Sequence, residues 1–512
     1  MTDATRAVVI DTQSLDWRDV VAVARHGQPL ELSPAAWSRV RDARTAVEDF
    51  ANSGTAYYGI NTGLGALCNV VLERSQLQQL SWHTLMSHSC GVGTPLRKEQ
   101  VRAIICAAVI NYSHGCSGVS TAVVEGLIRL LNEDIVPQVP SQGSVGYLSH
   151  MAHIGLALLG QGEVEFQGRV VPAAKALAAV KMTAVELGPK DGLCLVNGTP
   201  AMTGLACLTL EDSARLAAWA DLIGAMSFEV LRGQLDALSP EVTSRKLHPG
   251  VQHCGESLRQ LLADSPFLAA AQGDHLQDAL SLRSIPQVHG ACRDQFHHAA
   301  RQVCAELNSA TDNPLVIRGE SGYRVISQAN PHGESVAMAC DLLAMAVCEW
   351  SSISERRSYR LVTPQANQLP PFLIKDSGVK SGMMIAQYCA ASLVADNKRL
   401  AQPAVTDNFL TSGLQEDHLS LGESAALKLD KALGNAFHVL AIEYLLAAQA
   451  FDLCGGTGFG RGTRLAWQQL RSRVAVYEEE HSLHLDMRAT CELMHEAAPL
   501  ATLREAFPLL DT

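Results

Sequence analysis

The chain has 512 residues, and its 52 acidic and 40 basic side chains give a formal net charge of -12. No cluster of Lys and Arg forms the basic stripe that phosphate backbones require, so the composition excludes a nucleic-acid-binding protein and favours a small-molecule substrate. Hydrophobic residues make up 47% of the chain but aromatic residues only 5%, and a core built from Ala, Leu, Val, Met and Ile favours helices.

The cysteines and the N-terminus indicate a cytoplasmic protein. None of the 14 cysteines lies in a CxxC pattern, and most stand in apolar runs, as reduced, buried thiols do. The first residues, MTDATRAVVIDTQSLDWRD, lack the basic region and apolar block of a signal peptide. Asn, His, Ser or charged residues interrupt the longer apolar stretches, so we expect no membrane span.

The N-terminal part of the chain is rich in glycine turns. Short apolar runs alternate there with YYGINTGLG, SHSCGVGTPL, SHGCSGVS, QGSVGYLSH and VNGTPAMTG. Glycine permits tight turns, and loops of this kind often carry binding and catalytic residues. We therefore expect a loop-rich N-terminal domain over 1–200, which carries Tyr58 and the GSVG turn.

The remainder, 201–512, is predicted to be helical. No proline interrupts 203–231, 334–361 or 423–454, and an interior proline would cost a helix about 3 kcal/mol. These segments carry apolar residues on all sides, which is typical of helices at the centre of a bundle or in a subunit interface. The expected fold is mostly α, with a long central helical bundle, a C-terminal helical part and association into a homo-oligomer.

Two patterns that suggest bound ions are better explained otherwise. Three pairs of histidines stand close in sequence, namely His150 with His153, His297 with His298, and His481 with His484. No carboxylate or thiolate completes a familiar ligand set beside them, and the motif HExxH is absent. We therefore predict no metal site. The run GGTGFGRG follows a predicted helix instead of a strand, which favours a C-terminal cap and loop over a phosphate-binding loop.

The sequence TAYYGINTGLG places Tyr57 and Tyr58 before a glycine-rich turn. A tyrosine on such a loop can act as a general base if neighbouring cations or dipoles lower its pKa from about 10. The commoner role of a tyrosine is to pack its ring on the core. The segment alone leaves both roles open.

Two basic side chains stand in apolar or glycine-rich surroundings. Arg283, in LSLRSIPQ, needs an anion, either an internal carboxylate or a substrate carboxylate. Lys380, in GVKSG, either changes its pKa or needs a carboxylate, for which Glu416 and Asp417 of QEDH are candidates.

Taken together, the loops resemble one family. The resemblance rests on ten motifs in the same order and approximate spacing: TAYYGINTGLG, SH..GVGTPL, GSVG, VNGTPA, SLRSIPQVHGA, TDNPLV, SERR, QLPPFL, SGMMIAQ and QEDH. They are similar to those of the aromatic amino-acid ammonia-lyases, most closely histidine ammonia-lyase, over nearly the whole chain. The resemblance implies a histidine ammonia-lyase-like fold, a homotetramer and active sites that loops of several subunits share.

The same resemblance implies roles for individual residues. Tyr58 matches the catalytic tyrosine, Glu416 the site glutamate and Arg283 the carboxylate-binding arginine. Three further substrate-binding positions are implied, namely His88, Asn197 and Gln277.

The chain departs from the family at its cofactor. In the family, GSVG is followed by Ala-Ser-Gly, which cyclises to the electrophilic methylidene-imidazolone (MIO). Here GSVG runs directly into Tyr147, Leu148 and Ser149. We therefore expect no cofactor.

Other pocket positions differ from the histidine enzymes as well. Leu280 stands where they have a second tyrosine, Pro331 where they have a phenylalanine, and Lys380 where most family members have asparagine. These changes put ordinary histidine deamination in doubt.

These departures are similar to those of the superfamily members that lack the cofactor and eliminate trimethylamine from ergothioneine, the betaine of 2-thiohistidine. We expect such a carbon–nitrogen lyase, with Tyr58, Lys380 and Glu416 as catalytic residues and Tyr147 beside the N-methyl groups. The alternatives are a lyase for another histidine-type betaine or for histidine, and a non-catalytic paralogue that binds a histidine-like ligand.

Overall fold

A computed structural model describes residues 6–11, 13–65, 69–406 and 408–511. The chain forms two compact units. The first unit comprises Met1–Glu211, Ala299–Asp341 and Pro403–Leu427, and the second unit comprises Asp212–His298, Leu342–Gln402 and Lys428–Thr512.

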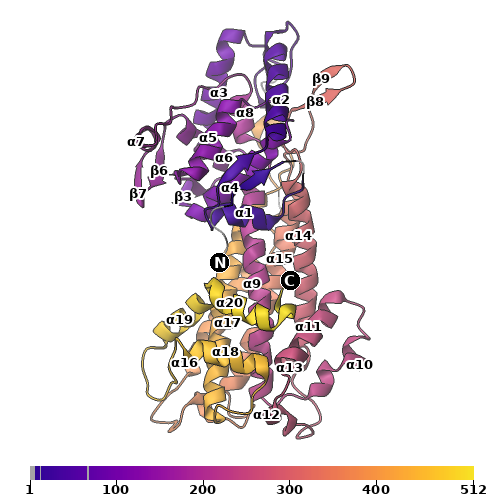
Figure 1. The fold of residues 1–512 in the computed structure, drawn as a ribbon, viewed down its shortest axis with the longest axis vertical. Helices are drawn as coiled ribbons and strands as arrows, with labels where there is room; N and C mark the ends of the chain where they lie inside the picture. Colours follow the sequence, from indigo (N-terminus) through magenta and orange to yellow (C-terminus); the bar gives the residue numbers. More distant parts are fainter. Residues whose placement is uncertain (1–5, 12, 66–68, 407, 512) are drawn as a thin grey trace. The chain divides into compact units, whose positions relative to one another are not determined.

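Four of the five unit boundaries fall inside long helices, which are α9 (Pro200–Val230), α14 (Ile285–Leu307), α15 (Glu334–Val362) and α17 (Gly422–Leu453) (Figure 1). The fifth boundary lies between Gln402 and Pro403, outside the helices. The domain boundary expected near residue 200 coincides with the start of α9. The units cut across that boundary because these helices begin in one unit and end in the other.

The first unit combines short helices with small sheets. Its helices are α1 (Trp17–Ala24), α2 (Pro34–Asn52), α3 (Arg74–His88), α4 (Lys98–Ser113), α5 (Thr121–Asn132), α6 (Ser149–Leu158), α7 (Ala173–Ala179) and α8 (Asp191–Val196), with the 3-10 turn η4 (Ser412–Leu414). Local sequence explains several boundaries: Ser33 caps α2 with Pro34 as its first residue, and Asp16 forms a capping box for α1.

Four small sheets belong to the same unit. Its strands are β1 (Val8–Ile10), β2 (Leu30–Leu32), β3 (Val92–Pro95), β4 (Val136–Pro137), β5 (Pro140–Gln142), β6 (Glu163–Phe166), β7 (Arg169–Pro172), β8 (Leu315–Gly319) and β9 (Gly322–Ile326). The pair β1–β2 is parallel, while β3–β5, β4–β6–β7 and the hairpin β8–β9 are antiparallel. The loops between these short elements carry the candidate site.

The second unit contains most of the long helical segments. Its own helices are α10 (Pro240–Thr243), α11 (Pro249–Leu261), α12 (Pro266–Ala269), α13 (Leu280–Arg283), α16 (Met384–Leu400), α18 (Arg461–Arg471), α19 (Leu483–His495) and α20 (Ala497–Ala506), with the 3-10 turns η2 (Leu235–Leu238), η3 (Pro371–Leu373) and η5 (Pro508–Leu510). The three helices predicted at 203–231, 334–361 and 423–454 are confirmed as α9, α15 and α17.

These helices are not purely apolar, since they bury ion pairs. Asp221 of α9 accepts from Arg293 (2.7 Å) and lies 2.8 Å from His289 Nδ1, all on fully buried side chains. Arg357 of α15 donates to both carboxylate oxygens of Glu443 on α17 (2.5 and 2.9 Å). Burial raises the pKa of Asp221, but Arg293 and His289 outweigh burial and hold that pKa below its usual range.

Among the residues that the structure describes, three helical segments are long and apolar enough to cross a membrane. They are Asp191–Val230, Glu334–Val362 and Gly422–Leu453, and 100%, 72% and 83% of their most apolar windows are buried inside the protein. Burial by neighbouring parts of the protein accounts for their apolar character.

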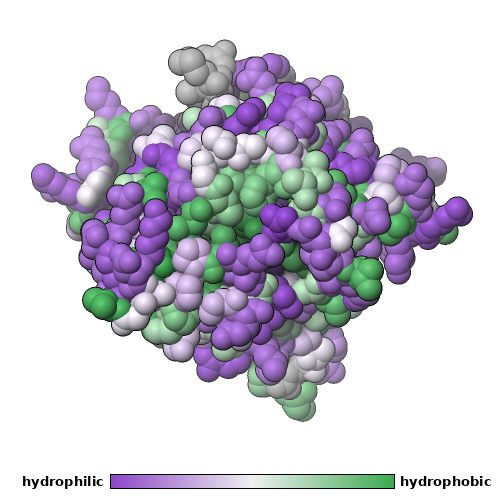
Figure 2. Space-filling view, turned by 90° about the horizontal axis from the view of Figure 1, so that it is seen from below, coloured by the Kyte–Doolittle hydropathy of each residue, from purple (hydrophilic) through white to green (hydrophobic). Residues whose placement is uncertain are grey.

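Apolar side chains also reach the surface. Figure 2 shows a face on which hydrophobic residues gather near the centre and hydrophilic residues surround them. Exposed large hydrophobic residues of the second unit include Met345 and Tyr359 on α15 and Ile385 and Tyr388 on α16. Surfaces of this kind often serve as interfaces between protein chains.

Candidate active site

The GSVG turn is pressed against the segment that follows Glu416. A Cβ atom on Gly146, whose φ is +131°, would lie 2.2 Å from Ser420 Oγ, so only glycine fits there. The backbone N–H of Leu421 donates to the carbonyl oxygen of Val145 (3.0 Å). This close approach fixes the turn beside the QEDH segment.

Directly after the turn, the backbone folds back sharply at Leu148. Its φ of 81° and ψ of -62°, with a hydrogen bond from Ser149 N to the Tyr147 carbonyl oxygen (3.2 Å), form a γ-turn of the rare, strained form. Ser144 Oγ donates to the same carbonyl oxygen (3.1 Å). The chain thus passes from GSVG into α6 with only two intervening residues, and two hydrogen bonds hold the carbonyl oxygen of Tyr147.

The Tyr147 phenol faces Glu416. Burial raises the pKa of Tyr147 well above its usual value, and the Glu416 charge, a hydrogen bond to Glu416 and the neighbouring Tyr58 raise it further. Tyr147 is therefore protonated at neutral pH and donates to the Glu416 carboxylate. The first unit brings together three residues that the sequence singled out, Tyr58, Tyr147 and Glu416.

Glu416 is held by Thr411. The two residues form an isolated β-bridge, with Thr411 N donating to the Glu416 carbonyl oxygen (2.9 Å). The Thr411 hydroxyl also donates to Glu416 Oε2 (3.1 Å). The backbone and the side chain of Thr411 thus orient the Glu416 carboxylate. Nothing in the sequence of this loop indicated a role for Thr411.

The two neighbouring tyrosines differ in their surroundings, and only the packing role is shown directly, for Tyr57. The ring of Tyr57 packs against Phe50, with ring centroids 4.6 Å apart, and joins a core cluster with Val47 and Ile60. Tyr58 is half-buried in the turn that follows and lies near Tyr147. Tyr57 is thus the core residue and Tyr58 the candidate base.

Asn197 is oriented by a buried ion pair that the sequence reading missed. Its amide nitrogen donates to Asp312 Oδ1 (3.2 Å) and to the carbonyl oxygen of Asn313 (2.7 Å). Asp312 in turn accepts from the fully buried Lys190 (2.7 Å). Both N–H groups of the Asn197 amide are engaged, so only its oxygen can meet a ligand without loss of these bonds. Binding of a carboxylate by Asn197 would require one of them to break.

His88 ends α3 and is partly buried. Its Nδ1 lies 2.8 Å from the Thr84 carbonyl oxygen and 3.0 Å from Ser87 Oγ. In the part of the chain that the structure describes, these contacts hold the ring by Nδ1, so Nε2 is the nitrogen available to a ligand.

In the second unit, Arg283 is paired with Gln277. The hydrogen-bond donors around Gln277 indicate that its amide oxygen, not its nitrogen, faces Arg283. In this orientation the oxygen accepts from both terminal guanidinium nitrogens of Arg283 (2.5 and 3.2 Å). The amide is neutral, so this contact adds no negative charge beside Arg283. That arrangement fits the alternative in which Arg283 binds a substrate carboxylate.

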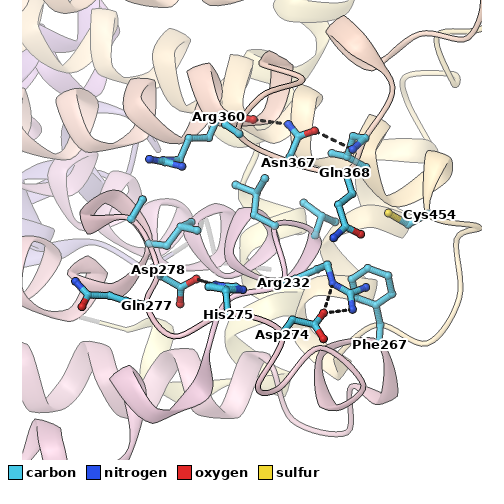
Figure 3. A pocket seen from close by; sticks show the side chains of 16 residues that line it. Arg232, Phe267, Asp274, His275, Gln277, Asp278, Arg360, Asn367, Gln368 and Cys454 are labelled. Carbon is cyan, nitrogen blue, oxygen red and sulfur yellow. Dashed lines mark hydrogen bonds and ion pairs between the residues drawn. The ribbon is translucent and has the colours of Figure 1, made fainter.

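Gln277 also lines a polar cavity of about 520 Å³ within the second unit. Its wall contains the ion pair of Arg232 with Asp274 and a contact of His275 Nε2 with Asp278 (2.7 Å), and Asn367 donates to the carbonyl oxygen of Arg360 (Figure 3). The remaining labelled lining residues are Phe267, Gln368 and Cys454.

Lys380, also in the second unit, has a carboxylate partner that the sequence reading did not identify. Its Nζ donates to Glu479 (2.8 Å) and to the carbonyl oxygen of Glu478 (3.1 Å). The hydrogen bond to Glu479 raises the pKa of Lys380, so the side chain is a cation at neutral pH. The acidic run YEEEH was the available signal for this partner. The expected coupling to Glu416 joins residues of different units and stays a prediction.

Comparisons with known proteins agree on the family. The family model "Aromatic amino acid lyase" matches residues 15–472. A histidine ammonia-lyase of Treponema denticola is 40% identical, with 96% of this chain and 97% of that protein covered, and one of Gloeobacter violaceus is 42% identical, with 98% and 99% covered.

Solved structures agree as well. Histidine ammonia-lyase from Trypanosoma cruzi is similar with a TM-score of 0.92 and 33% identity, covering 99% of this chain and 98% of that one. Ergothionase from Treponema denticola, in complex with desmethyl-ergothioneine sulfonic acid, gives a TM-score of 0.91 and 29% identity, covering 97% of this chain and 100% of that one. The mostly α, histidine ammonia-lyase-like fold is thereby confirmed, and the chain belongs to the aromatic amino acid lyase family, as a protein of the histidine ammonia-lyase type.

Proposed function

We propose that this chain is a carbon–nitrogen lyase that works without MIO and eliminates trimethylamine from ergothioneine, giving thiolurocanate. The observation that carries the proposal is the position of Tyr147. It follows GSVG where the family has its cofactor-forming residues, and its phenol donates to Glu416.

The chemistry of the leaving group explains why the electrophile is dispensable. A base strong enough to remove the β-proton of an α-amino acid would sooner deprotonate the ammonium group, which spoils it as a leaving group. A quaternary ammonium has no N–H. When the base removes the β-proton, the C–H electrons form the α–β double bond, the C–N electrons stay on nitrogen, and neutral trimethylamine departs.

The residues of the first unit fit this reaction. Tyr147 remains protonated, so we assign Tyr58, as its phenolate, as the base that takes the β-proton and becomes a neutral phenol. The Glu416 carboxylate and the Tyr147 ring offer a negative charge and an aromatic face to the trimethylammonium group. Asn197 contributes an oxygen acceptor, which suits a cationic head group better than a carboxylate.

The residues of the second unit supply positive charge. Arg283, with a neutral partner in Gln277, binds the substrate carboxylate. We assign to Lys380 the stabilisation of negative charge that develops on the thio-imidazole ring. We further propose a homotetramer in which several subunits contribute to one site, which the exposed apolar residues of α15 and α16 support.

Replacing Lys380 by Met is expected to abolish turnover and leave assembly unchanged, because the variant loses the cation but keeps the length of the side chain. Trimethylamine release and light scattering test this. The control is Lys375→Met, which removes an exposed lysine of the same loop and should retain wild-type activity. Substantial turnover by the Lys380 variant would remove Lys380 from the mechanism.

The experiment that tests the substrate compares ergothioneine, histidine betaine and histidine with purified protein and no added cofactor. The expected result is trimethylamine and the ultraviolet band of a conjugated thio-imidazole acrylate from ergothioneine, with no ammonia from histidine. Efficient reaction of histidine betaine instead would assign the enzyme to the sulfur-free substrate. Absence of any product would favour a non-catalytic binding protein.

A further inference from the structure

Two segments of the first unit bring together three potential metal ligands outside the proposed roles. One ligand atom each of His332, Glu334 and His418 lies within 4.8 Å of the other two. His332 Nε2 is 3.0 Å from His418 Nδ1, and the rings are tilted by 34°. His332 and Glu334 flank the start of α15, whereas His418 lies in the QEDH segment.

One carboxylate oxygen of Glu334 has no hydrogen-bond donor among the described residues. This atom, Oε2, is buried. A buried carboxylate oxygen without a donor or cation costs free energy. Its place in the first turn of α15 gives Glu334 a favourable helix dipole, but no direct partner for Oε2.

We propose that His332, Glu334 and His418 bind one divalent transition-metal ion of the zinc class, with a position left open for water. Two imidazoles and one carboxylate form a ligand set suited to such an ion. With Zn–N distances of about 2.0–2.1 Å, two nitrogens of a tetrahedral site lie roughly 3.3–3.4 Å apart. The imidazole nitrogens need to separate by only a few tenths of an ångström to admit the ion.

Both ligand-bearing segments are fixed without a metal. Gly333 and Gly422 each approach Met202 so closely that a Cβ atom would lie 2.2 and 2.4 Å from its sulfur, so both segments pack against the same side chain. Leu419, next to His418, exchanges two hydrogen bonds with the Asn408 side chain (2.9 and 3.0 Å). The ligands therefore come from segments already held in place, which lowers the cost of assembling the site.

A second group of potential metal ligands differs because its carboxylate already has partners within the protein. Asp221, Cys254 and His289 also lie within reach of one another. There, however, Arg293 donates to one oxygen of Asp221 (2.7 Å), while Cys254 Sγ and His289 Nδ1 contact the other (3.3 and 2.8 Å). The guanidinium already supplies the positive charge, and we propose no ion at that group.

The test uses the purified full-length protein, freed of metal by chelator dialysis and titrated with Co²⁺. The wild type should bind one Co²⁺ per chain with visible d–d absorption bands, and Zn²⁺ should displace it. His332→Gln and His418→Gln should each weaken binding by at least about 10-fold. The control, His83→Gln, replaces an exposed histidine of α3 and should bind as the wild type does.

The outcomes separate the metal from the simpler arrangement in which the two imidazoles only share a proton. Absence of saturable Co²⁺ uptake by the wild type would overturn the proposal, as would equal uptake by both ligand variants. The wild-type titration alone can overturn the proposal, so the test remains valid even if a variant fails to fold. Glu334→Gln, which keeps the shape of the side chain, provides a further ligand variant.

Discussion

Replacing Tyr58 by Phe is expected to lower kcat for trimethylamine release by about 100- to 10,000-fold, because it removes the group that takes the β-proton. Tyr147 cannot substitute for it, since burial and Glu416 keep the pKa of Tyr147 well above its usual value. KM should change much less than kcat, as the ring of Tyr58 remains in place. Steady-state kinetics with ergothioneine measures both.

The adjacent tyrosine provides the matched control. Tyr57→Phe also removes one hydroxyl from the same turn, but the Tyr57 ring packs against Phe50 in the core. Its activity should equal that of the wild type. Equal impairment of the two variants would mean that the loop needs both hydroxyls for its structure and that Tyr58 has no special part in proton transfer.

Replacing Lys190 by Met is expected to destabilise the protein by about 3–5 kcal/mol, the usual cost of leaving one partner of a buried ion pair alone. The Lys190 side chain is fully buried and donates to Asp312, which also accepts from Asn197. The midpoint of chemical denaturation measures the loss. The exposed Lys175 provides the control, since Lys175→Met should change stability by less than about 0.5 kcal/mol.

The pH dependence gives an independent check on the same pair. Burial lowers the pKa of Lys190, but the charges of Asp312 and Cys194 and the hydrogen bonds to both together outweigh burial, so the pKa in the folded state lies above its usual value. Stability from a raised lysine pKa is fully present below the unfolded pKa, about 10.4, and is lost as the pH rises through the folded one. The difference between wild type and Lys190→Met should therefore be constant near neutral pH and shrink in strong alkali. A difference that stayed constant through strong alkali would contradict the assignment.

The helical part of the fold was accessible from the sequence because its signal is continuous. Long, apolar, proline-free segments predicted α9, α15 and α17 to within a few residues. The site was not accessible in this way. Residues 58, 147 and 416 lie far apart in the chain, and their meeting was expected only from the resemblance to a family.

Other features of the site depend on contacts between residues that are distant in sequence, and these contacts are set by tertiary packing. The γ-turn at Leu148 has a positive φ that leucine does not prefer, and it lies two residues after the close approach of Gly146 to Ser420. Glu479, the partner of Lys380, lies about a hundred residues further along the chain. His332 and His418 are also distant in sequence, and neither stands in a familiar metal-binding pattern.

The central claim is elimination without an electrophilic prosthetic group, and one measurement tests it most directly. The protein is treated with borohydride, which reduces and inactivates an MIO group, and trimethylamine and thiolurocanate released from ergothioneine are then quantified beside an untreated sample. Undiminished release of both products in equal amounts is the predicted result. Loss of activity after treatment, or release of ammonia from histidine that borohydride abolishes, would contradict the account.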